Sequence, residues 1–367
     1  MNWRYHIRGV GVAVAALVLV AACGSSGNNT TASCGASAKS AADCGGMDAL
    51  VSAAKKEGNL NVIALPHDWT DYGQIIDAFK AKYGIAINEI SPNDGSQQEV
   101  DKIKSLGSRG PDVVDVGTAV ALKNTDLFAP YQVTTWKDIP ASQKEPTGLW
   151  FQDYGGFMSI GYDSSKVTVT SINDLLGSSF RGKVALPGNA LLSNQAVNSI
   201  MAVSLANGGS LDDISKGVDW FHTLKKNGNW VPVIGTTATV KAGATPVLFE
   251  WSYNALTHVT DVPTWKVYLP SGNVVGSYYN QAISKTAPHP AAARLWEEFL
   301  FSDVGQNWYL KGGALPIRLV AMTTAGSIDK AALAALPPVN GTPVFMSDAQ
   351  STAASAYLAA HWAAAIG

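Results

Sequence analysis

The fold is decided by the stretch LNVIALPHDWTDYGQIIDAFKAKYGIAINEI, residues 60–90. Residues 60–65 form a short apolar run that predicts a strand, and a polar loop follows at 66–73. Residues 74–83 repeat apolar side chains at the spacing of one helical face, and residues 85–90 alternate like a strand. A strand, a helix and a second strand in this order form the unit of a parallel sheet, so the stretch predicts an α/β fold.

The same alternation returns farther along the chain. Residues 111–117 (PDVVDVG) predict another strand, and residues 184–187, 194–206 and 231–234 predict a strand, a helix and a strand. Between these two sets lies an apolar strand with glycines at both ends, YGGFMSIGY at 154–162. Glycines that flank an extended segment between two α/β halves suit a hinge. The sequence therefore predicts two lobes.

The chain begins with the pattern of a secretory signal. Arg4 and Arg8 precede an apolar run at 10–22, which is shorter than the roughly 20 residues that span a bilayer. The run ends in VAAC at 20–23, which resembles the lipobox of bacterial lipoproteins, in which acyl chains are attached to the cysteine. We expect cleavage before Cys23 and a lipid anchor on it. The alternative is an ordinary cleaved signal with an incidental cysteine.

Residues 23–46 are rich in Gly, Ser, Ala, Asn and Thr, which predicts a flexible tether. The chain has three cysteines, so lipidation of Cys23 would leave Cys34 and Cys44 as a pair. In an oxidising compartment such a pair can close a small disulfide loop. Two free thiols are the alternative.

Composition and motifs exclude several function classes. The formal net charge is −2, 15% of the residues are charged, and no basic tract exists, which argues against a nucleic-acid partner. The sequence contains no GxSxG, HExxH or Walker A motif, and its six histidines lack metal-ligand spacing. We therefore expect no enzyme, no cofactor and no metal site. The eleven tryptophans suit a ligand cleft, because an indole offers a flat apolar face and one polar group.

Several further segments occur in a recurring order. They are Ala54–Val62 (AKKEGNLNV), Ile76–Ile85 (IDAFKAKYGI), Gly110–Asp115 (GPDVVD), Phe180–Gly188 (FRGKVALPG), Pro288–Leu300 and Ser302–Gln306. Behind a lipobox, this order resembles the extracellular solute-binding proteins of bacterial ABC importers, in the cluster that binds spermidine/putrescine, thiamine, phosphonate or ferric iron. The resemblance covers about residues 48–328. It implies a two-lobed periplasmic-binding-protein-like fold of type II, with a ligand cleft between lobes joined by crossover strands.

We expect the chain to be divided accordingly. The expected parts are a signal peptide at 1–22, a lipidated tether at 23–46, lobe 1 at 47–155 and again at 251–312, lobe 2 at 156–250, and a C-terminal helical part at 313–367 that packs mainly on lobe 2. The expected partners are a small solute, an ABC permease with its ATPase subunit, and the membrane through the lipid anchor. We expect a monomer on the extracytoplasmic face of the cell membrane, in the periplasm or the cell-wall space.

The loop after the first strand supplies the first candidate ligand contacts. Open α/β sheets bind ligands outside the carboxyl ends of their strands. Trp69, Thr70 and Tyr72 keep the spacing of an Asn-Trp-Thr-x-Tyr run in polyamine-binding relatives, and Trp69 would stack on a cation. Asp68 and Asp71 would balance the charge of an amine. The alternative is that Thr70 or Asp71 only caps the next helix.

Later strand ends supply the remaining candidates. Thr118 follows the strand at 111–117, and Asn189 and Ser193 follow the strand at 184–187; helix capping is the alternative role. Glu250, Trp251 and Tyr253 follow an apolar strand, with packing between lobes or an ion pair as the alternative.

Tyr278 and Tyr279 are adjacent in a strand, so they face opposite sides. Ferric-binding relatives use consecutive tyrosines together with a histidine and a carboxylate, for which His67 and Glu250 are available. Carboxylates near aromatic rings favour a small, polyamine-like organic cation instead. The alternatives are ferric iron, thiamine or phosphonate on the same fold. An exported hydrolase and a lipoprotein adhesin are rivals of another class, but the sequence shows no paired nucleophile and base for the hydrolase.

Overall fold

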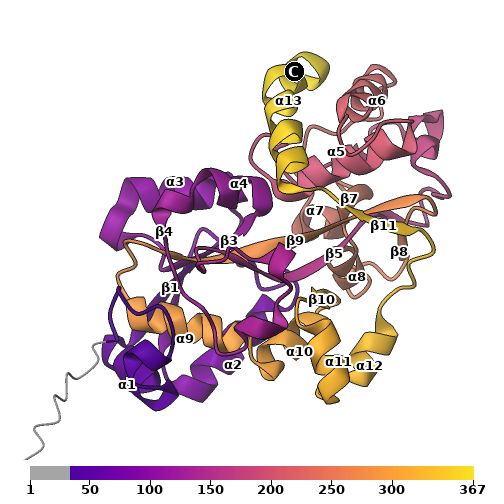
Figure 1. Ribbon diagram of the computed structural model, residues 1–367. Coiled ribbons are helices and arrows are strands. Elements are labelled where there is room, and N and C mark those ends of the chain that lie inside the picture. Colours follow the sequence, from indigo (N-terminus) through magenta and orange to yellow (C-terminus); the bar gives the residue numbers. More distant parts are fainter. Residues whose placement is uncertain (1–33) are drawn as a thin grey trace, which may run out of the picture. The chain divides into compact units, whose positions relative to one another are not determined.

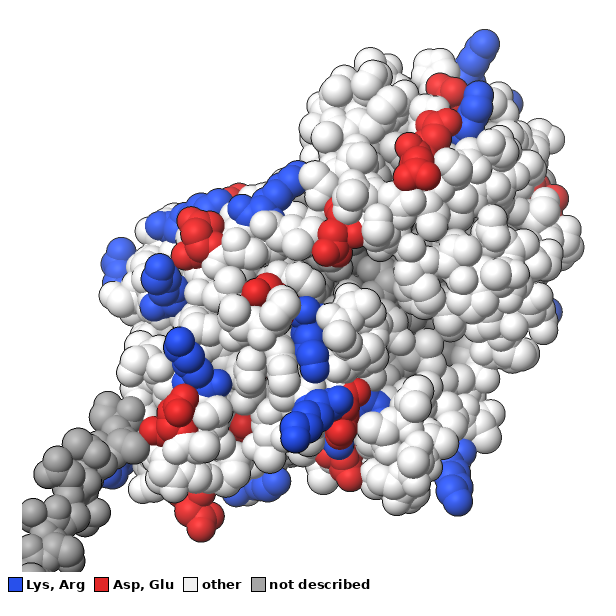
Figure 2. Space-filling view, in the orientation of Figure 1, with Lys and Arg blue, Asp and Glu red and all other residues white. Residues whose placement is uncertain are grey.

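The computed structural model describes residues 34–367 (Figure 1). The expected signal peptide and Cys23 lie outside the described residues. Within 34–367, no helix combines the length and the apolar character needed to cross a membrane. On the face shown in Figure 2, charged side chains of both signs are scattered over lobe 1, and most of lobe 2 is uncharged.

Lobe 1 begins with strands and helices in alternation. They are α1 (Met47–Glu57), β1 (Asn59–Ile63), α2 (Tyr72–Tyr83), β2 (Ala86–Ile90), α3 (Ser96–Leu106), β3 (Val113–Gly117), α4 (Thr118–Lys123) and β4 (Phe128–Ala129). β1 and β2 pair in parallel around α2, which confirms the predicted strand–helix–strand unit. Figure 1 shows α3 and α4 on one side of the strands, with α2 and α9 (Pro290–Leu300) on the other. An apolar core fills the space between these layers.

Two long antiparallel strands, β5 (Phe151–Asp163) and β9 (Asn273–Ser284), connect the lobes. In lobe 1, β9 pairs with β3 and β4. In lobe 2, β5 pairs with β7 (Val247–Trp251) and β8 (Trp265–Tyr268). A single strand thus belongs to the sheets of both lobes. This arrangement confirms the predicted two-lobed α/β fold with crossover strands.

Lobe 2 is built around β7. Its other elements are β6 (Val184–Ala185), α5 (Asn194–Ala206), α6 (Ser215–Lys226), α7 (Thr237–Lys241) and α8 (Ser252–Thr257). β6 pairs with β7 in parallel, and α5 packs on α6. The inner face of α6 carries Phe221, which contacts the ring of Phe249 in β7 at a centroid distance of 5.6 Å. Burial of such aromatic surface holds this lobe together.

The C-terminal part of the chain contributes elements to both lobes. After α9 follow α10 (Asp303–Lys311), β10 (Leu315–Pro316), α11 (Leu319–Ala325), α12 (Lys330–Ala335), β11 (Thr342–Phe345) and α13 (Asp348–Ile366). α12 packs on α10 in lobe 1, whereas α13 packs on α6 in lobe 2 and also contacts α4 of lobe 1. The expected C-terminal part, residues 313–367, is therefore divided between the lobes.

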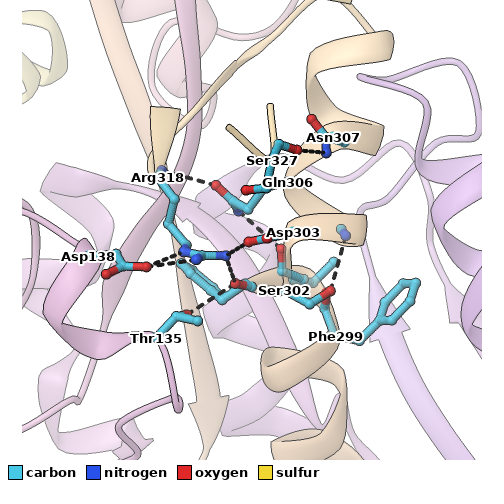
Figure 3. A network of polar contacts seen from close by, with 12 residues as sticks. Thr135, Asp138, Phe299, Ser302, Asp303, Gln306, Asn307, Arg318 and Ser327 are labelled. Carbon is cyan, nitrogen blue, oxygen red and sulfur yellow. Dashed lines mark hydrogen bonds and ion pairs between the residues drawn. The ribbon is translucent and has the colours of Figure 1, made fainter. Parts of the chain in front are cut away.

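A buried arginine fixes β10 beside the crossover strand β5 (Figure 3). The Arg318 guanidinium donates to Asp138 at 2.7 and 3.0 Å and to Asp303 at 2.8 Å. Its backbone N–H donates to Gln306 at 3.1 Å. A charge that is 7% exposed is tolerated only with such partners. The network holds the turn before α11 in place.

Residues 34–46 are folded against lobe 1 rather than extended as a tether. Cys34 and Cys44 form a disulfide, and Cys44 is buried. Arg294 of α9 donates to the carbonyl oxygens of Ala36 and Ala38, at 2.7 Å each. The disulfide and the buried guanidinium together give this Gly- and Ala-rich segment the anchoring that its composition alone does not predict.

Candidate functional site

A cavity of about 550 Å³ lies where loops of lobe 1 meet loops of lobe 2. Lobe 1 lines it with residues that follow β1 and β2, with Asp115 inside β3 and with Tyr279 of β9. Lobe 2 contributes residues after β6, the loop before α7 and the end of β7 with α8. The position agrees with the rule that α/β sheets bind ligands beyond the carboxyl ends of strands.

The lobes touch each other beside this cavity. Thr237 of α7 donates its hydroxyl to the Asp68 carboxylate of lobe 1. The backbone N–H of Gln97 in α3 donates to the carbonyl oxygen of Leu192 in lobe 2 at 3.4 Å. Gly117 lies so close to Asn194 that a Cβ atom at this glycine would stand 2.5 Å from the asparagine side chain. The absence of a side chain at Gly117 therefore permits this approach of the two lobes.

The cavity wall is acidic. Five carboxylates line it: Asp68, Asp94, Glu99, Asp115 and Glu250. No lysine or arginine among residues 34–367 lines it, and its basic side chain is His258. Lys102 pairs with Asp94 at 2.7 Å, which neutralises one carboxylate from outside the wall. Such a cleft concentrates positively charged solutes and repels anions.

Asp115 is a buried acid of the lobe 1 wall. It lies in β3 and is 6% exposed. Its Oδ2 accepts hydrogen bonds from Tyr72 at 2.9 Å and Tyr154 at 2.8 Å, whereas Oδ1 has no partner. Burial raises the pKa of Asp115 to about 7, although the two hydroxyls lower it. Burial, and then the charge of Asp115, also raise the pKa of Glu99 well above its usual range.

Trp69 forms a rigid aromatic part of the wall. Its indole N–H donates to the Tyr154 hydroxyl at 2.7 Å. Its ring meets Tyr279 and Tyr253 edge-on, with centroids 5.7 and 5.8 Å apart. These contacts fix the indole while part of it lines the cavity. An indole held in this way suits a cation or an alkyl chain.

Lobe 2 supplies a buried carboxylate–histidine pair. Glu250 Oε2 lies 3.0 Å from His258 Nε2, and both side chains are 3% exposed. Burial raises the pKa of Glu250. Burial alone would lower the pKa of His258, but the charge and the hydrogen bond of Glu250 raise it overall. When His258 is protonated, its imidazolium balances Glu250 without an external cation.

Amide side chains complete the lobe 2 wall. Gln195 accepts hydrogen bonds from the backbone N–H of Trp251 at 3.3 Å and from Asn254 Nδ2 at 3.1 Å. The side-chain oxygen Oδ1 of Asn254 and the side-chain nitrogen Nδ2 of Asn194 are buried without protein partners. Buried polar groups of this kind require a partner, so they are available to a bound solute.

The structure brings six of the predicted contacts to the cavity. They are Asp68, Trp69, Asn189, Ser193, Glu250 and Tyr279. Tyr72 lies in the core of lobe 1 and reaches the site only by donating to Asp115. Thr118 accepts a hydrogen bond from Asn280 at 3.2 Å instead of facing the cavity. Its role is therefore within lobe 1.

The other predicted contacts also lie outside the wall. Thr70 is buried, and Asp71 precedes α2 in the left-handed backbone region, with a φ of 67°. Trp251 and Tyr253 are fully buried behind the wall. Trp251 is the last residue of β7 and faces away from its neighbour Glu250, and Tyr253 lies in the first turn of α8. Tyr278 stacks on Phe345 with centroids 6.0 Å apart. The two adjacent tyrosines thus do not face the same space.

Sequence reasoning missed several lining residues, chiefly Glu99, Asp115, Asn254 and His258. A carboxylate within the apolar strand VVDVG is the one signal that marks Asp115 in the sequence. Within the part of the chain that the structure describes, no group of three or more His, Cys, Asp or Glu side chains is arranged to hold a metal ion.

The chain is similar to known proteins over most of its length. Residues 111–334, more than half of the chain, match the family described as bacterial extracellular solute-binding protein. Among solved structures, iron-bound HitA from Pseudomonas aeruginosa is 20% identical, with a TM-score of 0.61; the similarity covers 82% of this chain and 97% of HitA.

Two further structures share the fold. A Listeria monocytogenes protein described as a spermidine/putrescine ABC transporter is 14% identical with a TM-score of 0.62, covering 83% of this chain and 99% of that protein. AfuA from Actinobacillus pleuropneumoniae, with fructose-6-phosphate bound, is 15% identical with a TM-score of 0.66, covering 84% of this chain and 98% of AfuA. Such low identities show the fold alone.

Proposed function

The chain belongs to the bacterial extracellular solute-binding proteins, and from this premise we propose that it captures a small organic cation for an ABC importer. Proteins of this family work outside the cytoplasm and bind solutes rather than transform them. The finer part of the proposal concerns the charge of the solute. It also includes a lipid anchor at Cys23, a monomeric state, and delivery to a permease driven by an ATPase subunit.

The single observation that carries the proposal is the charge of the cavity wall. Five carboxylates line it, and among the described residues no lysine or arginine does. Lys102 balances Asp94, and His258 balances Glu250, which leaves Asp68, Glu99 and Asp115 without a basic partner among the lining residues. Burial raises the pKa of Glu99 and Asp115, so their ionised forms are costly while no positive charge is near. A cationic solute would supply that charge, and Trp69 would offer it an aromatic surface.

The ligands of the similar structures allow a comparison. A phosphorylated sugar, as bound by AfuA, would place a multiply charged anion against these acids. Iron, as bound by HitA, would be held through consecutive tyrosines in the arrangement considered above, yet Tyr278 packs on Phe345 and only Tyr279 lines the cavity. A polyamine-like cation fits the wall better than either, and thiamine is the second cationic candidate.

A thermal-shift screen tests the proposal. The probes are putrescine, spermidine, thiamine and choline, with fructose 6-phosphate, a phosphonate and Fe³⁺ as comparators. A solute that binds only the folded state at about 100 times its Kd stabilises it by about 2.7 kcal/mol, which raises Tm by several degrees. We expect at least one of the four organic cations to give this shift, and neither the anions nor Fe³⁺.

Variants locate the binding in the cavity. Trp69→Ala should abolish the shift, whereas Trp308→Ala, which removes a partly buried indole of α10 outside the cavity, should keep it. A larger shift with fructose 6-phosphate or the phosphonate than with any cation would overturn the cation proposal. Hydrolysis of an ester or peptide by the purified protein would favour the exported hydrolase instead.

A further inference from the structure

Asp115 is a buried carboxyl group with two hydroxyl partners and, among the described residues, no basic side chain beside it. We propose that the cationic group of the solute docks on Asp115 and displaces a proton from it, so that capture of the solute releases a proton. This inference rests on the proposed function and adds to it the residue that recognises the charge and the proton that is exchanged.

The geometry leaves one oxygen of Asp115 without a hydrogen-bond partner in the described part of the protein. Oδ2 is occupied by the hydroxyls of Tyr72 and Tyr154, at 2.9 and 2.8 Å. Oδ1 is buried, has no partner in the protein, and belongs to a side chain that lines the cavity. A buried carboxylate oxygen without a donor is costly. A proton removes that cost when the cavity is empty, and an ammonium group removes it when the cavity is filled.

The groups that face Asp115 from its neighbours are acids and phenols. The acids are Glu99 from α3, Asp153 from β5 and Glu297 from α9. The phenols are Tyr72 from α2, Tyr154 from β5, Tyr253 from α8, Tyr279 from β9 and Tyr309 from α10. Several buried carboxyl groups cannot all be ionised, and the charge of Asp115 raises the pKa of Glu99 and of Asp153. Burial raises the pKa of Asp115 itself to about 7, so Asp115 is protonated below that pH in the empty protein.

The exchange balances in atoms and in charge. The neutral carboxyl group of Asp115 loses its proton to water, and the carboxylate pairs with the solute cation, which keeps its own protons. Binding is thus favoured by high pH. With a pKa near 7 in the empty protein, the affinity for a cation should rise about tenfold between pH 6 and pH 8.

Isothermal titration calorimetry of the whole protein tests the coupling. The probes are putrescine and choline, and the charge of choline does not change with pH. At pH 7, titrations in buffers of different ionisation enthalpy should report release of about half a proton per bound cation. Asp115→Asn should abolish this release and flatten the pH profile. Asp77→Asn, which removes an exposed carboxylate of α2, should change neither.

A positioning residue supplies a second variant. Tyr72 does not line the cavity, and its hydroxyl lowers the pKa of Asp115. Tyr72→Phe should therefore move the midpoint of the affinity profile to higher pH without abolishing binding. A purely structural role of Tyr72 would weaken binding equally at every pH.

The melting temperature without solute tests the pKa of Asp115 even if a variant binds no cation. Because the folded-state pKa of Asp115 is raised, its protonation stabilises the fold at low pH, and this stabilisation is lost as the pH rises through about 7. Asp115→Asn should accordingly raise Tm at pH 8 by more than at pH 5. An equal change at both pH values would overturn the inference.

The outcomes separate this inference from the proposed function. Absence of binding by every cation overturns the proposed function and the coupling with it. Binding without pH dependence and without proton release leaves the proposed function intact and overturns the coupling alone. Proton release that persists in Asp115→Asn assigns the exchange to another acid, with Glu99 the first to test, and also overturns the role given to Asp115.

Discussion

Two buried carboxylates face the same cavity with different partners. Glu250 has an imidazole nitrogen at 3.0 Å, whereas Asp115 has two phenol hydroxyls and no cation. A buried charge is tolerated when a partner charge or several hydrogen bonds compensate for lost hydration. Within residues 34–367, Oε1 of Glu250 and Oδ1 of Asp115 both lack a protein partner, but Glu250 has an ionisable base beside its other oxygen and Asp115 has none. This difference assigns the two acids to different roles in one site.

The Glu250–His258 pair gives a prediction that needs no solute. In the wild-type protein the pKa of His258 should lie above its ordinary value of about 6.5, because Glu250 outweighs the effect of burial. The pair then stabilises the fold below about pH 6.5, and this contribution is lost as pH rises through the raised pKa. In Glu250→Gln the anion is gone and burial remains, so the pKa of His258 should fall below 6.5.

Nuclear magnetic resonance of the His258 ring proton across pH 4–9 measures both values. Glu89→Gln is the matched control, because it removes the partner of the exposed His67, 2.7 Å away, and leaves His258 unaffected. A pKa of His258 that is unchanged in Glu250→Gln would show that the pair is neutral in the folded protein.

Residue-level sequence reasoning reached the cavity where a side chain lies at or beyond the end of a strand. Trp69, Asn189 and Glu250 were predictable on that ground, since strand ends converge at one edge of a sheet. The burial of Trp251 and Tyr253 was not predictable, because the sequence does not show which side of β7 faces the cleft or how α8 continues from it. Asp115 escaped because it lies inside an apolar strand, where a sequence pattern does not show which face meets the cleft.

At the scale of elements, the crossover strand β5 meets two structural requirements. It must continue the sheets of both lobes, and it must let buried aromatic rings pack against its backbone. Gly156 allows the ring of Tyr253 to pack against the backbone of β5, because a Cβ atom at this position would stand 2.6 Å from that ring. That ring is fully buried and cannot retreat. The position of the glycines in YGGFMSIGY predicts a hinge, whereas this packing role depends on tertiary contacts that the sequence does not display.

Substitution of Gly156 tests this packing role. Gly156→Ala should lower the free energy of unfolding by about 1–3 kcal/mol, the usual cost of overpacking a filled core. Gly272→Ala is the matched control, since nothing lies within 4 Å of the position of its Cβ atom, at the start of β9. Urea denaturation of both variants measures the difference. Equal stabilities of the two variants would show that β5 or Tyr253 adjusts at no cost.

At the scale of the whole described unit, the C-terminal helix α13 is a second connection between the lobes. It packs on α6, where Trp362 meets Phe221 at a centroid distance of 5.5 Å, and it also touches α4 of lobe 1. The Ala-rich sequence predicts a helix there. It does not predict the two-sided contact, because alanines on every face leave no single apolar stripe to orient the helix. Solute capture requires that the state with the lobes together binds the solute more tightly than the state with the lobes apart. Contacts between the lobes set the equilibrium between these two states.

A small notch beside α13 allows this balance to be changed on purpose. The notch has a volume of about 60 Å³, and it is lined by Ala119 and Val120 of α4, Leu191 of lobe 2 and the partly buried Ser355 of α13. Ser355 does not line the solute cavity. Ser355→Arg would overfill the notch and push α13 away from α4.

We expect the affinity for a bound cation to fall by about tenfold, because a variant that favours separated lobes must spend part of the binding free energy on bringing them together. Small-angle scattering of the cation-saturated variant should show a larger radius of gyration than the saturated wild type. Ala360→Arg, at an exposed position of the same helix that does not line the notch, should alter neither quantity. If Ser355→Arg binds as tightly as the wild type, the contact of α13 with lobe 1 has no part in holding the lobes around the solute.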